Sequence, residues 1–153
     1  IPDDNDGLPF QGDSEVVNQN KLFEEASDDY FKETHPKDWE YNLAAYTGTH
    51  DSPTIKQWLN EASKSQILNF NKYTERLNNK FDSDVWNFIS LMWESPCQLA
   101  LTTVQDLLQL GSSARFNVPG TTENNWKWRI GNLSSLDSVV TNLKIMNKNN
   151  ERN

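Results

Sequence analysis

The stretch Ala-Ala-Tyr-Thr-Gly-Thr-His-Asp at residues 44–51 decides the fold class of this chain. It predicts a short buried strand that ends abruptly in polar residues, and the last two, His50 and Asp51, can carry chemistry. The residues that follow predict a helix, with Ser52 as its N-cap and Pro53 at its first position. A carboxylate at the carboxyl end of a strand, just before a helix, is typical of α/β enzymes. We therefore expect the functional site at Asp51.

Three segments downstream have apolar residues at the spacing of an amphipathic helix. They comprise residues 53–63, 66–79 and 84–94. Ser83 is the expected N-cap of the third helix, which should be the best buried because Trp86 and Trp93 widen its apolar stripe. These two residues and Trp58 are expected to belong to the core.

A second short strand, also buried, is expected at residues 98–102, an apolar run that follows Pro96. The order of elements is therefore strand, helices, strand, helical turn, loop and helix, which is an α/β alternation. Two parallel strands do not make a stable sheet of their own. We therefore expect part of a larger sheet or barrel, with an apolar edge that associates with itself or with the missing part.

The C-terminal third predicts a turn, a loop and a helix. Residues 104–110 form the turn, which should end at Gly111 in the C′ position. Residues 112–133 have no periodic pattern and predict a long loop, which in a compact domain is usually functional. The last helix should begin at Ser134, and the polar residues 147–153 should be frayed.

Acidic residues are concentrated in the first third of the chain. Residues 1–51 have a net charge of −10, and the remainder has a net charge of +2. Residues 1–13 predict a loop and residues 14–33 a strongly acidic helix with a solvated face. This distribution argues against a nucleic-acid partner, because it offers no basic surface for a phosphate backbone.

The composition sets further limits on the class of protein. The 153 residues suffice for one domain, but a mean hydropathy of −0.79 predicts a modest core. A single cysteine, Cys97, excludes an internal disulfide and favours a reduced, cytoplasmic compartment. No apolar run is long enough for a membrane span. Because the chain starts at Ile1 without a signal peptide, it looks like part of a longer protein.

Two sequence blocks resemble one enzyme family. The first is Tyr46-Thr47-Gly48-Thr49-His50-Asp51. The second comprises Gln105-Asp106-Leu107-Leu108-Gln109-Leu110-Gly111, Ala114-Arg115, Asn117, Pro119-Gly120-Thr121 and Asn125-Trp126-Lys127-Trp128-Arg129. Together they resemble the 4-alpha-glucanotransferases of the amylomaltase, or disproportionating enzyme, type. The resemblance covers roughly residues 40–130, and the second block is the longer and more specific.

The resemblance implies an α/β fold, the C-terminal part of a (β/α)8 barrel of the alpha-amylase clan, helix-rich as an isolated segment. We expect one segment in three regions, a divergent acidic region (1–42), a motif-bearing barrel segment (43–133) and a C-terminal helix and tail (134–153). The implied reaction transfers segments of α-1,4-glucans, including maltooligosaccharides, to a new acceptor through a covalent glycosyl-enzyme intermediate. No metal ion and no cofactor is expected.

The resemblance also assigns roles to single residues. Asp51 corresponds to the carboxylate that stabilises the distorted sugar in the transition state, and His50 to a neighbouring histidine that binds sugar. Asn117 corresponds to a position that contacts glucan. Arg115 either contacts sugar or holds the loop, and Trp126 either stacks on a glucose ring or packs the loop against the barrel. An ionised Asp51 would be favoured by the helix that begins just downstream.

The sequence departs from the family pattern upstream of Asp51. The nucleophile and the acid/base motifs are absent, and residues 5–35 do not match the strand expected there. Ser52-Pro53 replaces a more usual polar pair. We therefore expect the isolated chain to be inactive, since it supplies one of three carboxylates, and a non-catalytic glucan-binding or scaffold module is the alternative function.

Two further residues leave alternatives open. Asp106 follows the second strand, so it is either catalytic by position or a structural cap of the next turn. His35 is expected to be a loop residue. A metal phosphohydrolase that uses His35, His50, Asp51 and Asp106 is a weaker hypothesis, because that chemistry would place its ligands on helices.

Overall fold

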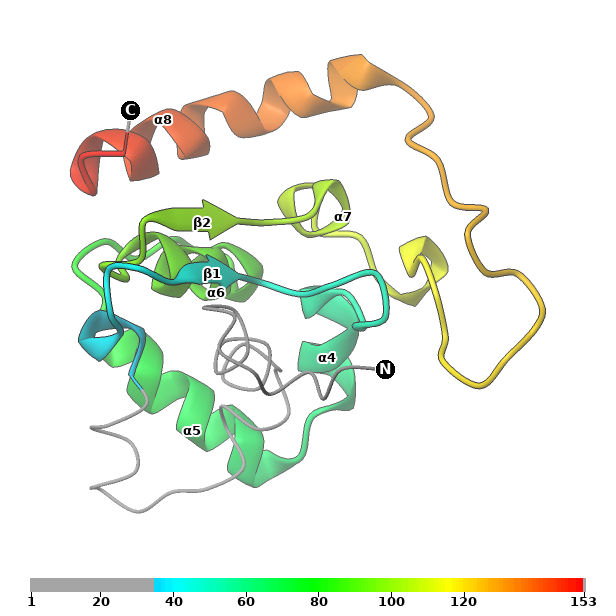
Figure 1. Ribbon diagram of the computed structural model, residues 1–153, viewed down its shortest axis with the longest axis horizontal. Coiled ribbons are helices and arrows are strands. Elements are labelled where there is room, and N and C mark those ends of the chain that lie inside the picture. Colours follow the sequence, from blue (N-terminus) through cyan, green and yellow to red (C-terminus); the bar gives the residue numbers. More distant parts are fainter. Residues whose placement is uncertain (1–34, 153) are drawn as a thin grey trace.

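A computed structural model describes residues 35–152 of the chain (Figure 1). The expected loop at residues 1–13 and the acidic helix at residues 14–33 lie outside these residues. No helix among residues 35–152 is long and apolar enough to cross a membrane. The described part begins with a short 3-10 helix, η1 (Pro36–Asp38), which leads into the first strand.

Two short parallel strands form the sheet of the described part (Figure 1). Strand β1 (Ala44–Tyr46) pairs with β2 (Leu99–Leu101), with Ala45 opposite Ala100. Both expected strands are therefore confirmed. The expectation that β2 is buried is wrong, because Leu99 and Leu101 are each 52% exposed. Within residues 35–152, β1 is the one strand beside β2, so the other edge of β2 has no strand partner among these residues.

Three helices connect the strands: α4 (Ile55–Glu61), α5 (Lys64–Glu75) and α6 (Asp84–Trp93). Helix α6 has the expected N-cap, Ser83, whose hydroxyl accepts from the amide of Trp86. The N-cap expected for α4 is wrong. Thr54 caps that helix, so Pro53 precedes it, while the hydroxyl of Ser52 accepts a hydrogen bond from the amide of Thr49.

Helix α5 begins and ends earlier than its apolar pattern predicts. Ser63 accepts from the amide of Gln66, and the Gln66 side chain accepts from the amide of Ser63, which completes a capping box. This reciprocal pair fixes the first turn at Lys64. The helix ends at Glu75, although Leu77 beyond it still packs in the core.

The hydrophobic core lies between α6 and the other elements. Every residue of α6 after Asp84 is buried, in agreement with the widened apolar stripe. The rings of Trp58, Phe70 and Phe88 contact one another with centroids 6.0 to 6.2 Å apart. Burial of Trp58, Trp86 and Trp93 confirms that these tryptophans are core residues.

The region after β2 is mostly irregular. Helix α7 (Val104–Leu107) is followed by Gln109, which adopts a left-handed backbone with φ of 54°. Gln109 therefore takes the conformation expected of a C′ glycine, and Gly111 instead precedes a 3-10 turn, η2 (Ser112–Ala114). A long irregular segment follows, in agreement with the expected loop.

The C-terminal helix begins as a 3-10 helix. Residues Leu133–Val139 form η3, and Val140–Asn149 form α8. The expected start at Ser134 is wrong because the Asn132 side chain accepts from the amide of Ser134 and caps η3. The expected fraying is also wrong, since the Arg152 guanidinium donates to the carbonyls of Trp93, Ser95 and Cys97.

Candidate functional site

The segment between β1 and α4, residues 47–54, is termed the 47–54 loop. Its middle is a tight turn in which the Ser52 amide donates to the Thr49 carbonyl over 3.2 Å. The Asp51 amide donates to the Thr49 hydroxyl over 3.3 Å. Thr47 and Thr54 at the ends of the loop are buried, whereas Thr49, His50 and Asp51 at its tip are exposed. The turn therefore presents His50 and Asp51 to solvent.

The Asp51 carboxylate has a donor at each oxygen. The Asn117 amide donates to Oδ1 over 2.5 Å, and His50 Nε2 lies 3.2 Å from Oδ2. The Asp51 side chain is nevertheless 48% exposed and that of His50 is 54% exposed. A carboxylate oxygen can accept more than one hydrogen bond. Asp51 is thus oriented by neighbours from two loops while it remains accessible to a ligand.

Arg115 joins the 47–54 loop to the loop that follows η2. Its Nη2 donates to the Asp51 carbonyl over 2.8 Å, and its Nε donates to the Asn117 carbonyl over 2.9 Å. These are the contacts of the loop-supporting alternative. One planar guanidinium therefore fixes the backbone at both Asp51 and Asn117, whose side chains are hydrogen-bonded to each other.

Trp126 brings an aromatic face to the same place. Its ring centroid lies 5.1 Å from that of His50, and it meets Phe116 edge to face at 4.7 Å. The side chain is 54% exposed and its backbone has φ of 62°, which is unusual for a bulky residue. Trp126 therefore packs against neighbouring rings and also keeps an accessible face. These observations do not decide between packing of the loop and stacking on a glucose ring.

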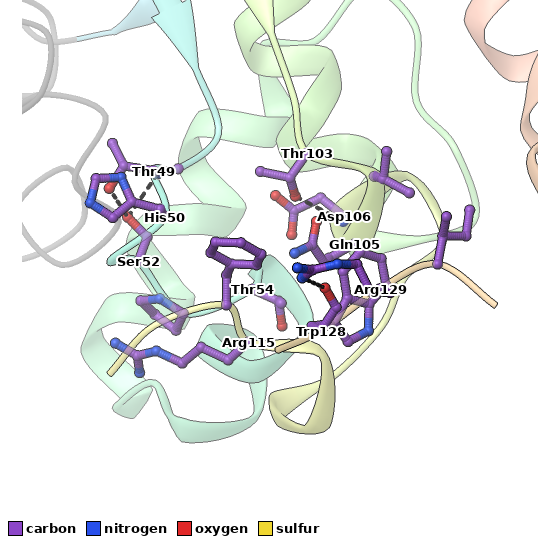
Figure 2. A pocket seen from close by; sticks show the side chains of 15 residues that line it. Thr49, His50, Ser52, Thr54, Thr103, Gln105, Asp106, Arg115, Trp128 and Arg129 are labelled. Carbon is purple, nitrogen blue, oxygen red and sulfur yellow. Dashed lines mark hydrogen bonds between the residues drawn. The ribbon is translucent and has the colours of Figure 1, made fainter. Parts of the chain in front are cut away.

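A cavity of about 570 Å³ opens beside these residues (Figure 2). It lies between the 47–54 loop, the start of α7 and the segments at residues 115–116 and 128–130. Aromatic, basic and hydroxyl side chains are prominent in its lining. The full lining comprises Gly48, Thr49, His50, Ser52, Pro53, Thr54, Thr103, Val104, Gln105, Asp106, Arg115, Phe116, Trp128, Arg129 and Ile130. His50 is common to this cavity and to the contact with Asp51.

Asp106 is buried at the base of this arrangement, with 2% of its surface exposed. Its Oδ1 accepts from the amide of Ile55 and its Oδ2 from the hydroxyl of Thr47, both over 2.8 Å. Burial raises the pKa of the Asp106 carboxyl, while these hydrogen bonds act in the opposite direction. The geometry matches the structural alternative for Asp106, although the helix that it caps is α4.

The start of α4 is held by a carboxylate other than Asp51. The first amide of α4 donates to Asp106, not to Asp51. Sequence reasoning had no signal for a cap supplied from 51 residues away.

His35 lies apart from the site and is fully buried, so the expectation of a loop residue understates its role. Its ring stacks on Tyr73 at 5.2 Å, its Nδ1 accepts from the Lys37 amide and its Nε2 lies 3.3 Å from the Tyr73 carbonyl. Among residues 35–152 no three His, Cys, Asp or Glu side chains are grouped to hold a metal ion. Of the four residues of the phosphohydrolase hypothesis, His50 and Asp51 are in contact, but no third one joins them.

Comparison with known proteins places these features in one family. A family model described as 4-alpha-glucanotransferase matches residues 16–134. The 4-alpha-glucanotransferase of chloroplasts and amyloplasts from Arabidopsis thaliana is 37% identical over 110 residues, 69% of this chain and 18% of that protein. That of Clostridium butyricum is 34% identical over 111 residues, which are 70% of this chain and 21% of that protein.

A solved structure agrees with the sequence matches. The amylomaltase from Streptococcus agalactiae in complex with acarbose has a TM-score of 0.69 and 27% identity, over 78% of this chain and 24% of that one. The architecture is therefore that of an α/β segment of an amylomaltase-like protein. This chain belongs to the 4-alpha-glucanotransferase family, and it spans about a fifth of the length of the curated relatives that it matches.

Proposed function

We propose that this chain is the C-terminal part of a (β/α)8 barrel that transfers segments of an α-1,4-glucan to an acceptor glucose or glucan. The reaction is a retaining double displacement, with an Asp nucleophile and a Glu acid/base in the rest of the barrel. Asp51 is the third carboxylate, and His50 and Asn117 bind the sugar beside it. The observation that carries the proposal is the meeting of these three residues from two distant loops.

The geometry of Asp51 suits a carboxylate that binds sugar hydroxyls. Asn117 and His50 each contact one oxygen of the Asp51 carboxylate, and about half of the Asp51 side chain stays exposed. Hydroxyl groups of a ring that flattens toward an oxocarbenium ion can donate to the accessible lone pairs. Interactions that strengthen as the transition state forms are those that raise the rate.

The other two roles at this site follow from their positions. Trp126 offers an exposed aromatic face beside His50, which suits stacking on a pyranose ring. Arg115 supports both loops and does not need to touch sugar to do so. The acarbose in the structure of the amylomaltase from Streptococcus agalactiae belongs to that protein, and here it serves as the natural probe.

The alternative is a non-catalytic glucan-binding or scaffold module. The proposal and the glucan-binding form of the alternative both require that this chain contact glucan, whereas a scaffold does not. The cytoplasmic compartment inferred from the lone Cys97 stays a prediction, because the name of the Arabidopsis relative places that enzyme in plastids.

Titration of the isotopically labelled chain with acarbose tests glucan binding. We expect shifts of the amide signals of Thr49, His50, Asp51 and Asn117, because the ligand would replace solvent at the Asp51 carboxylate. Asp51→Asn should weaken binding by roughly tenfold or more, as loss of a charged hydrogen-bond acceptor does.

The matched control is Asp137→Asn, which neutralises an exposed carboxylate on η3. It should leave acarbose binding unchanged. Binding that is equally weakened by both variants would reflect net charge and would contradict the assignment of Asp51.

A further inference from the structure

We propose that Asp106 is a positioning residue, which clamps both ends of the 47–54 loop and thereby sets the orientation of His50 and Asp51. This inference rests on the proposed function, since it concerns the geometry of the sugar-binding residues. Asp106 would contribute to sugar binding through the loop, without contact to the accessible side of Asp51.

The first end of the loop is held through Thr47. Thr47 is fully buried at the end of β1, and its hydroxyl donates to Asp106 Oδ2 over 2.8 Å. A hydroxyl has one proton to donate, and that of Thr47 goes to Asp106. The Thr102 hydroxyl, 3.1 Å away, must then donate to Thr47. This chain of hydrogen bonds ties the end of β1 to the segment after β2.

The second end of the loop is held through Ile55. Its amide, at the start of α4, donates to Asp106 Oδ1 over 2.8 Å, and Ile55 itself is buried. One carboxylate therefore takes one hydrogen bond from each end of the loop. The clamp is itself fixed, because the Asp106 amide donates to the hydroxyl of Thr103, the N-cap of α7.

The middle of the loop depends on these ends. Thr49, His50 and Asp51 are exposed, so core packing does not place them. Their contacts are those within the turn and those from the segment after η2, which are made by Arg115, Asn117 and the ring of Trp126. A shift at either end would move the tip against these partners.

A buried carboxylate is a costly way to fill this space. Apolar side chains of similar volume can replace buried charged groups without loss of stability. What an apolar residue cannot do is accept from Thr47 and Ile55 at once. The two acceptor oxygens of Asp106 therefore match a geometric requirement of the loop.

The contact between the rings of His50 and Trp126 reports the orientation of the loop without any ligand. Their centroids lie 5.1 Å apart, so nuclear Overhauser effects are expected between their ring protons in the unmodified chain. Thr47→Val keeps the shape of the side chain and removes the donor to Asp106. We expect it to remove most of the intensity of these signals, and Thr47→Ser to retain it.

Thr74→Val is the matched control. Thr74 is also buried, and its hydroxyl donates to the Asn71 carbonyl within α5. This variant should lose comparable stability and keep the His50–Trp126 signals. Asp106→Asn provides a second variant of the clamp, because an amide oxygen can replace one acceptor but not both.

Retention of the ring signals in both Thr47→Val and Asp106→Asn would overturn the inference, as would their absence from the unmodified chain. Equal loss in Thr74→Val would also overturn it, since the effect would then be one of general stability. Acarbose binding is measured on the same samples. Failure of the unmodified chain to bind acarbose contradicts the proposed function alone, because the ring contact is read without ligand.

Discussion

Two carboxylates near the ends of the strands, Asp51 and Asp106, have opposite environments. Asp51 is half exposed and is oriented by side chains, those of Asn117 and His50. Asp106 is buried and accepts from Thr47 and from the backbone of Ile55. A carboxylate with accessible lone pairs can bind sugar, whereas one whose oxygens are enclosed can only order the protein. The environments thus separate the two roles that the sequence left open.

The buried ring of His35 makes a prediction about stability and pH. Burial lowers the pKa of His35 from 6.5 to about 4, so the folded chain keeps the ring neutral while the unfolded chain protonates it. Stability is therefore complete above pH 6.5 and falls as the pH decreases toward 4. Between pH 7 and pH 5 this group should lower the free energy of unfolding by roughly 2 kcal/mol.

Urea unfolding at both values of pH measures this loss. His35→Phe keeps the stacking on Tyr73 and removes the titrating group. The variant should be less stable at pH 7 but should lose less stability on acidification than the unmodified chain. Since other groups titrate equally in both proteins, an identical loss would show that His35 is not responsible.

At the level of elements, patterns confined to a few residues predict structure well. Ser83 and the apolar residues after it specify α6, and the apolar runs at both strands specify β1 and β2. Boundaries fail where two local signals compete. Ser52 and Thr54 are both suitable N-caps of α4, and the choice depends on the turn that engages Ser52 with Thr49.

The same reasoning explains which parts of the site could be predicted. The sequence motifs pointed to Asp51, His50 and Asn117, which the structure brings together, although their roles in sugar binding stay predictions. The Asp106 clamp could not be predicted, because Asp106 lies 51 positions from Ile55 and 59 positions from Thr47 in the sequence. The anchoring of Arg152 depends likewise on the carbonyls of Trp93 and Ser95, at and just after the end of α6.

At the level of the whole molecule, the exposed face of β2 predicts association. Leu99 and Leu101 are large apolar side chains beside an unpaired strand edge within the described residues. Such edges recruit further strands. Light scattering of the isolated chain should therefore show a mass that rises with concentration, and Leu101→Lys should reduce this rise because a charge on the edge opposes pairing.

Leu133→Lys is the matched control, because Leu133 is also an exposed leucine but lies on η3. It should leave the association unchanged. A monomer at all concentrations, or equal effects of both variants, would contradict association through β2.

The central claim is that Asp51 stabilises the transition state of glucan transfer. Its most direct test uses a protein that combines this chain with the upstream segments that are proposed to hold the nucleophile and the acid/base. Asp51→Asn preserves shape and the hydrogen bond to Asn117 but removes the charge. We expect the rate of maltotriose disproportionation to fall by at least about a hundredfold, as loss of one transition-state contact does, with little change in the melting temperature.

Asp137→Asn in the same protein should retain the full rate. The measurement is the rate at which maltotriose yields glucose and longer chains, monitored by chromatography with no other enzyme present. A hundredfold loss in Asp51→Asn with a preserved fold is the result that the assignment predicts. Conversion of maltotriose at the unmodified rate by a folded Asp51→Asn protein would contradict it.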